Sequence, residues 1–194
     1  MKHSTNRRNL KMKSTRNKQK GVSIVGAILV VVMGSIGLAV IYGMYANWEE
    51  GNKTRTAVAM VNKAFDNLPA LKETYGTYDG LSNQVVYNSN EIVLEDDKSV
   101  TADEFVTPFS TNGLTFTSVD SATLINGRVL SGVDQYAQIT MSEVTNTLCQ
   151  DIVQGLFERA LEIRVGTTRV ATMPAVTTQC AAAGTTTNLV FISN

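Results

Sequence analysis

The sequence predicts an α+β protein in which a long N-terminal helix precedes a domain of strands and short helices. Residues 22–48 form a run of 27 residues without a charge. A helical period of apolar residues continues past this run to about Tyr75. Segments that alternate β-branched or aromatic residues with polar ones follow, and turn residues separate them.

The uncharged run is long enough to cross a membrane as a helix. About 20 helical residues span the hydrocarbon core of a bilayer. The 21 residues before the run carry eight Lys or Arg and no Asp or Glu. Because basic flanks stay in the cytoplasm, we expect residues 1–21 to be a cytoplasmic leader, residues 22–48 a transmembrane helix and residues 49–194 an exported domain.

The charge of the exported part argues against a nucleic-acid partner. The whole chain has 17 basic and 17 acidic residues, but residues 22–194 keep nine of the cations and all of the acids, a net charge of −8. A nucleic-acid-binding surface needs an excess of basic charge. The roughly 145 residues after the run suffice for one compact domain with its own core.

The second part of the long helix is expected to pack on the exported domain. Between Trp48 and Tyr75, apolar residues recur at three- and four-residue spacing among charged ones, which is typical of an amphipathic helix. They are Val58, Val61, Phe65 and Leu68. Pro69 is not expected to end the helix cleanly, whereas Gly76 and Gly80 indicate a turn.

Short helices and strands are predicted for the rest of the domain. We expect a short helix at 82–87, strands at 114–119 and 135–141, a helix at 142–157, and a closing strand at 188–193. An edge-accessible strand is expected at 160–165, with one apolar face and with Glu162 and Arg164 on the opposite, polar face. Ser142 is the candidate N-cap of the helix at 142–157, and its apolar stripe is Val144, Leu148, Ile152 and Leu156. Turns are expected at Asn126-Gly127 and Ser131-Gly132.

Cys149 and Cys180 are the only cysteines, and both lie in the exported part. In an oxidising compartment such a pair predicts a disulfide that closes a loop of about 30 residues. A zinc site would need four ligands, and the only histidine, His3, lies in the basic leader. Two buried thiols that never meet remain the alternative.

No active site is expected. The sequence has no phosphate loop, no nucleophile elbow and no metal-ligand spacing. Its neighbouring carboxylates are Asp96, Asp97, Asp103 and Glu104. They occupy polar turns, so we expect solvated surface rather than acid–base chemistry. We predict no enzyme, no catalytic residue, no cofactor and no bound metal.

Three interpretations of the N-terminal part compete. A secretory signal has a shorter apolar region of about 7 to 15 residues, and an uncleaved signal anchor fits the charge pattern alone. The third starts from the junction, where a basic leader ends in Gly21 and the apolar run begins at Val22. This arrangement resembles the class III signal of type IV pilins, in which a membrane peptidase cleaves after the glycine and methylates the new first residue.

The resemblance to type IV pilins extends to the order of elements and to the cysteine pair near the C-terminus. It implies cleavage between Gly21 and Val22, N-methylation of Val22, a Cys149–Cys180 disulfide and a long helix packed on a mainly antiparallel sheet. The long leader and the non-phenylalanine first residue are similar to the type IVb group, which includes bundle-forming, toxin-coregulated and conjugative thin-pilus pilins. The implied partners are other pilin subunits, the prepilin peptidase, the pilus assembly platform and the inner membrane.

Gly26 departs from the pilin pattern. Most pilins carry glutamate at this fifth mature position, where it is thought to pair with the N-terminal amine of a neighbouring subunit. Some minor, tip-located pilins and pseudopilins also lack this glutamate, so its absence argues against the role of a major subunit. Gly26 is also explained as a small residue in a close-packed helix bundle, together with Gly34, Gly37 and Gly43.

The function that the resemblance implies is that of a structural pilus subunit. It would move from the inner membrane to an extracellular pilus and serve attachment, aggregation or conjugative contact. Two alternatives stay open, namely an uncleaved single-span envelope binding protein and a pseudopilin of a type II secretion system.

Overall fold

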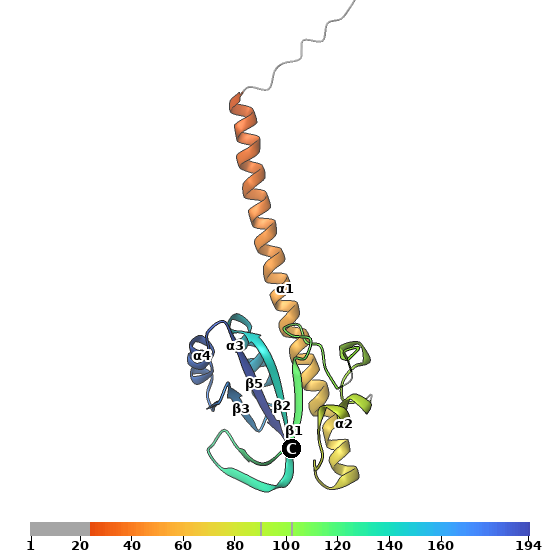
Figure 1. The fold of residues 1–194 in the computed structure, drawn as a ribbon. Helices are drawn as coiled ribbons and strands as arrows, with labels where there is room; N and C mark the ends of the chain where they lie inside the picture. The colour runs from red at the N-terminus through yellow and green to blue at the C-terminus, as the bar shows by residue number, and fades with distance from the viewer. Residues whose placement is uncertain (1–23, 90, 102) are drawn as a thin grey trace, which may run out of the picture. The chain divides into compact units, whose positions relative to one another are not determined.

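The computed structural model describes residues 24–194 except Asn90 and Ala102, and it divides the chain into two compact units. The first unit is Met1–Met44 and the second is Tyr45–Asn194. Helix α1, Ile24–Tyr75, supplies all of the described part of the first unit and the beginning of the second (Figure 1).

The second unit contains a five-stranded antiparallel sheet and short helices. After α1 the elements are α2 (Asn83–Asn88), the 3-10 turn η1 (Glu95–Asp97), β1 (Leu114–Thr123), β2 (Val129–Thr145), α3 (Asn146–Leu156), β3 (Glu162–Val165), β4 (Thr168–Val170), α4 (Met173–Ala182) and β5 (Thr186–Ser193). The strand order is β1-β2-β5-β3-β4, and every pairing is antiparallel. The α+β class predicted from the sequence is confirmed.

The part of α1 in the second unit packs through one apolar stripe. Ala57, Val61, Ala64 and Leu68 have no exposed surface, and they recur at the spacing of one helix face. Pro69 lies inside the helix without ending it. The helix ends at Tyr75, as predicted, where Gly76 adopts a φ of +78° and donates its N–H to the Lys72 carbonyl at 2.6 Å.

The main core lies between this stripe and one face of the sheet. Phe116, Ile139 and Phe191 stand opposite one another on β1, β2 and β5, and all three are buried. Helix α3 belongs to the same core. It approaches α1 closely because Gly155 lacks a side chain: a Cβ there would lie 3.0 Å from Cγ2 of Val58.

The distal half of the β1–β2 hairpin forms a second, smaller core. The pairing shifts register between Val119 and Ser121, and beyond this bulge Ala122 packs with Tyr136 and Ile192. On the facing strand Asp134 has a φ of +50°, and its N–H is donated to Oδ1 of Asp120 at 2.9 Å. These contacts fix the direction of the hairpin beyond the bulge.

Helix α2 covers the start of the edge strand β1. The Asn83 side chain donates to the Leu114 carbonyl at 3.1 Å and accepts from the Phe116 N–H at 2.8 Å. One amide side chain thus takes the place of a neighbouring strand along this stretch, so that these backbone groups are not left unpaired. The short helix predicted at 82–87 is confirmed.

The helix predicted from Ser142 begins later than expected. Ser142 donates its N–H to the Gly113 carbonyl, and Val144 pairs with Thr187 of β5, so both residues belong to β2. Helix α3 therefore starts at Asn146 with Thr145 at its N-cap. Pairing with two neighbouring segments outweighs the local capping signal.

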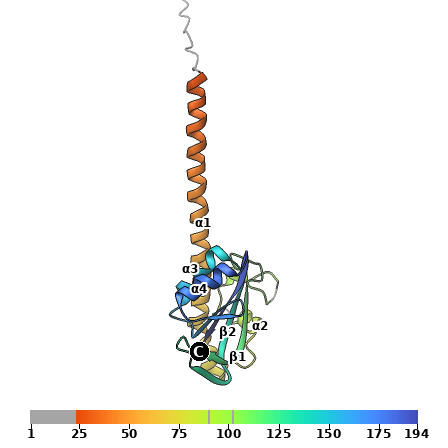
Figure 2. The same cartoon turned by 90° about the vertical axis from the view of Figure 1, so that its left-hand side faces the viewer.

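Two further sequence predictions were wrong, and two elements were missed. Ser131-Gly132 is not a turn, because Ser131 pairs with Ser121 inside the hairpin. The strand at 160–165 is β3, which lies between β5 and β4 and not at an edge. Strand β4 and helix α4 were not predicted. Helices α3 and α4 lie side by side in both views (Figures 1 and 2).

Candidate functional site

The described part of the first unit presents a continuous apolar surface. Every large apolar side chain whose exposure is known between Ile24 and Met44 is at least half exposed, from 50% at Val32 to 80% at Ile24. A surface of this size is far larger than the apolar patches that soluble monomers leave in water. Among the described residues one helix, α1, is long and apolar enough to cross a membrane by length and composition.

Small residues give this helix room for close neighbours. A Cβ added at Gly34, Gly37 or Gly43 would meet no described atom within 4 Å. The Ser35 hydroxyl donates to the Val32 carbonyl at 2.8 Å, so its polar group is satisfied within the helix. Gly26 also lies in α1. A second helix can therefore approach this backbone closely.

Aromatic and charged residues mark the end of the apolar run. Tyr45 and Trp48 form a tilted aromatic pair with ring centroids 6.2 Å apart. The first ion pair of the described chain follows directly, between Glu49 and Lys53 at 2.7 Å. Tyrosine and tryptophan followed by charges are typical of the boundary between hydrocarbon and water.

The predicted leader junction lies outside the described residues. Gly21 and Val22, the expected cleavage and methylation positions, precede the first described residue, as does His3. Cleavage and methylation therefore remain predictions.

Cys149 and Cys180 are bonded to each other. The bond joins α3 to α4, with the two Cα atoms 5.8 Å apart. Both cysteines are buried. In α4 the buried residues are Val176 and Cys180, so the disulfide is a principal attachment of that helix to the core. The enclosed segment contains β3 and β4.

The carboxylates that the sequence placed in turns do not form a site. Asp96 is exposed, and Asp97, Asp103 and Glu104 are half-buried. Burial raises the pKa of Asp97, the charge of Asp96 adds to this effect, and Lys63 opposes it. The described residues hold no group of three or more His, Cys, Asp or Glu side chains that could bind a metal ion.

Glu162 is a buried carboxylate that the sequence analysis missed. Its side chain is 2% exposed, and it accepts from Nε of Arg164 at 2.6 Å and from the N–H of Thr123. Alternation along the strand had placed Glu162 on the solvent side. The cations that follow at residues 164 and 169, in a domain poor in Lys and Arg, were the available signal.

Arg169, like Glu162, binds the backbone at the turn of the β1–β2 hairpin. Its guanidinium donates to the carbonyls of Thr123 at 3.3 Å and Ile125 at 3.4 Å, and also to that of Leu124. Together with Glu162 it ties the turn to β3 and β4. These hydrogen bonds restrict the turn at residues 123–125.

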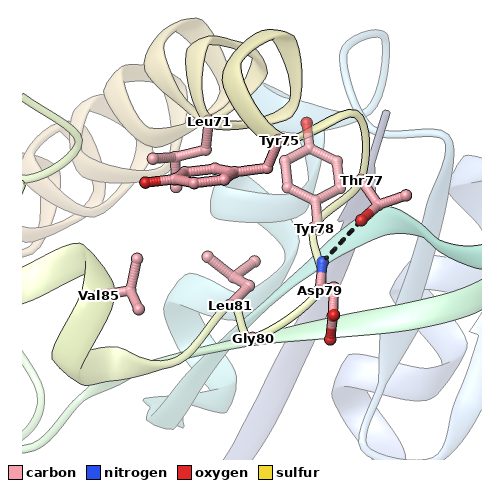
Figure 3. A pocket seen from close by; sticks show the side chains of 8 residues that line it. All are labelled: Leu71, Tyr75, Thr77, Tyr78, Asp79, Gly80, Leu81 and Val85. Carbon is pink, nitrogen blue, oxygen red and sulfur yellow. Dashed lines mark hydrogen bonds between the residues drawn. The ribbon is translucent and has the colours of Figure 1, made fainter.

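An apolar pocket opens where α1 meets α2. Its volume is about 220 Å³, and it is lined by Leu71, Tyr75, Leu81 and Val85, with residues 77–80 at its rim (Figure 3). Tyr75 is 73% exposed, whereas Tyr78 is buried. The Tyr78 hydroxyl has no hydrogen-bond partner among the described residues, and burial raises the pKa of Tyr78.

Comparison with known proteins finds similarity among solved structures and none among family models or curated sequences. No family model matches the chain, and no curated protein sequence matches it. The structure is similar to that of TcpA, a type IV pilin from the Vibrio cholerae El Tor biotype. The two chains share 14% sequence identity with a TM-score of 0.46, and the match covers 75% of this chain and 99% of that chain.

Proposed function

We propose that this chain is a structural subunit of a type IVb pilus and that it polymerises through the apolar first part of α1. The observation that carries the proposal is the exposure of every large apolar side chain of known exposure between Ile24 and Met44. Burying one Val, Leu or Ile side chain stabilises a protein by about 1.5 to 3 kcal/mol. Such a helix needs lipid or other helices around it, and a filament core supplies the second environment once the subunit leaves the membrane.

The leader junction supports a pilus subunit over a plain anchor. A basic leader that ends in Gly21 directly before the apolar run allows a cut that keeps this run in the mature protein. In the proposed pathway the prepilin peptidase cleaves after Gly21, Val22 is methylated, and the assembly platform adds the subunit to an extracellular pilus. Residues 22–48 form the filament core and residues 49–194 the exposed domain.

Gly26 bears on the place of the subunit in the filament. A buried N-terminal amine needs a partner, and Glu49 and Glu50 lie about 40 Å further along a helix that rises 1.5 Å per residue. We therefore propose that the subunit assembles together with a glutamate-bearing pilin or sits at the tip. Expression as the sole pilin with the assembly machinery tests this, since long filaments of this chain alone would contradict it.

Intact-mass analysis of the membrane and sheared-filament fractions tests the main proposal. The expected species begins at Val22 and carries one methyl group. Gly21→Val should block cleavage, because a glycine leaves room for close approach by the peptidase, whereas Gly34→Val is the matched control and should be cleaved normally. An uncut chain in cells with the peptidase would refute the proposal and support the anchor. A cleaved chain that never leaves the cell would support the pseudopilin.

A further inference from the structure

The second unit carries two separate surfaces with exposed apolar side chains. One is the hollow lined by Leu71, Tyr75, Leu81 and Val85, called here the apolar pocket. The other is the projecting turn of the β1–β2 hairpin, residues 124–129, in which Ile125 is 45% exposed. Helix α2 and the hairpin turn lie on opposite sides of β1 (Figure 1). One molecule therefore cannot fill its own pocket with its own turn.

The charges beside these two surfaces are complementary. Asp79 is exposed at the rim of the pocket, and Figure 3 shows its carboxylate directed away from the hollow. Arg128 is exposed on the hairpin turn. Neither side chain forms an ion pair with any residue that the structure describes. Residues 22–194 carry nine cations and 17 acids. Electrostatic complementarity therefore favours contact between the unpaired Arg128 on the hairpin turn and the acidic rim of the pocket at Asp79.

Hydrogen bonds also attach the hairpin turn to β3 and β4. Arg169 holds the carbonyls of Leu124 and Ile125, and Glu162 holds the N–H of Thr123. A side chain presented on a fixed backbone loses less conformational freedom on binding than one on a mobile loop. The hydrogen bonds of Glu162 and Arg169 thus lower the loss of conformational entropy when this turn contacts a partner.

We infer that the hairpin turn of one copy of this chain inserts into the apolar pocket of the next copy. Ile125 occupies the hollow beside Val85, and Arg128 pairs with Asp79 at the rim. Because the two surfaces differ, each copy uses one to bind the copy before it and the other to bind the copy after it; such contacts build an open polymer where the rotation between copies does not close into a ring. This inference rests on the proposed pilus function. It specifies which two surfaces of neighbouring exposed domains contact each other in the filament.

Disulfide cross-linking in assembled filaments tests the contact. A chain with both Val85→Cys and Ile125→Cys should give a ladder of covalent multimers on non-reducing electrophoresis, whereas each single variant should run as a monomer. The matched control is Val85→Cys with Val100→Cys, because Val100 is a fully exposed valine outside both surfaces. Filaments that form without a ladder would overturn the contact and leave the pilus function standing. Failure of the unchanged chain to enter any filament would overturn the function, and the contact with it.

A charge exchange tests the pairing at the rim. Arg128→Glu should lower the amount of filament by about two- to fivefold, the effect expected of one exposed ion pair. Adding Asp79→Lys should restore it. Both positions are exposed, so the fold should be unaffected. A double variant that assembles no better than the single variant would contradict the pairing of Arg128 with Asp79.

Discussion

Replacing both cysteines with alanine should lower the free energy of unfolding of the second unit by about 3 to 4 kcal/mol. The bond joins residues 31 positions apart, and the chain-entropy model gives about 3.7 kcal/mol for a loop of this length. Alanine is the appropriate replacement because both sites are buried, where the hydroxyl of a serine would add a separate desolvation cost.

The loss should be concentrated in α4. That helix fully buries only Val176 and Cys180, while Met173 and Ala175 pack against the core in part, so the bond is its main fixed link to α3. We expect α4 to open locally before the rest of the unit unfolds. A change of 3 to 4 kcal/mol in local opening corresponds to about two to three orders of magnitude in the opening equilibrium.

Hydrogen exchange of the detergent-solubilised full chain, followed by mass spectrometry, measures this opening. Amides of residues 173–182 should exchange much faster in the double alanine variant than in the unchanged chain. Thr178→Ala is the control, because Thr178 is exposed on the same helix and its loss should change stability by less than about 0.5 kcal/mol. An unchanged exchange rate in α4, with a total loss below about 1 kcal/mol, would refute the reasoning.

Three further predictions concern buried or half-buried polar groups. Tyr78→Phe should leave the free energy of unfolding at pH 7 unchanged or raise it by about 1 kcal/mol, because the hydroxyl has no partner among the described residues. The pKa of Tyr78 is raised, so the neutral phenol contributes fully to the free energy of unfolding below about pH 10, and this contribution is lost at higher pH. Urea unfolding should show this loss in the unchanged chain but not in the phenylalanine variant. The pKa of Asp97 is also raised, so the neutral carboxyl contributes fully to the free energy of unfolding below about pH 4, and this contribution falls as pH rises through the folded pKa. Asp97→Asn should flatten this part of the plot of stability against pH. An unchanged plot would contradict the assignment to Asp97. Arg169→Met should speed hydrogen exchange in residues 121–130 and cost about 1 to 3 kcal/mol, whereas Arg128→Met should leave exchange at the base of the hairpin unaltered.

Local patterns in the sequence determined the long helix and its end. The apolar spacing from Val58 to Leu68 and the glycine at position 76 are local signals, carried by residues that are close together in the sequence. The structure places the apolar stripe and the helix end where these signals predict. The same holds for the short helix α2 and for the existence of the strands. The cysteine pair predicted a bond because the expected oxidising compartment and the even number of cysteines, not geometry, were the basis of that prediction.

Contacts between distant segments decided the rest. Ser142 and Val144 have a helical pattern, yet Gly113 and Thr187 hold them in β2, so α3 starts four residues late. Glu162 alternates as a solvent-facing residue, but Thr123, 39 residues earlier in the chain, donates its N–H to the Glu162 carboxylate. Helix α4 has apolar residues all round and no amphipathic signal, and the bond to Cys149 holds it.

The sequence by itself determined the membrane-length helix and the division of the chain into a basic N-terminal segment, an apolar run and an acidic remainder, because composition and period are properties of the chain alone. Only the tertiary structure decided where the apolar pocket lies, that the hairpin turn projects on the other side of β1, and that a buried Glu162 and Arg169 hold that turn in place (Figure 1). Complementary surfaces arise from residues far apart in sequence, and their positions depend on packing that no local pattern records.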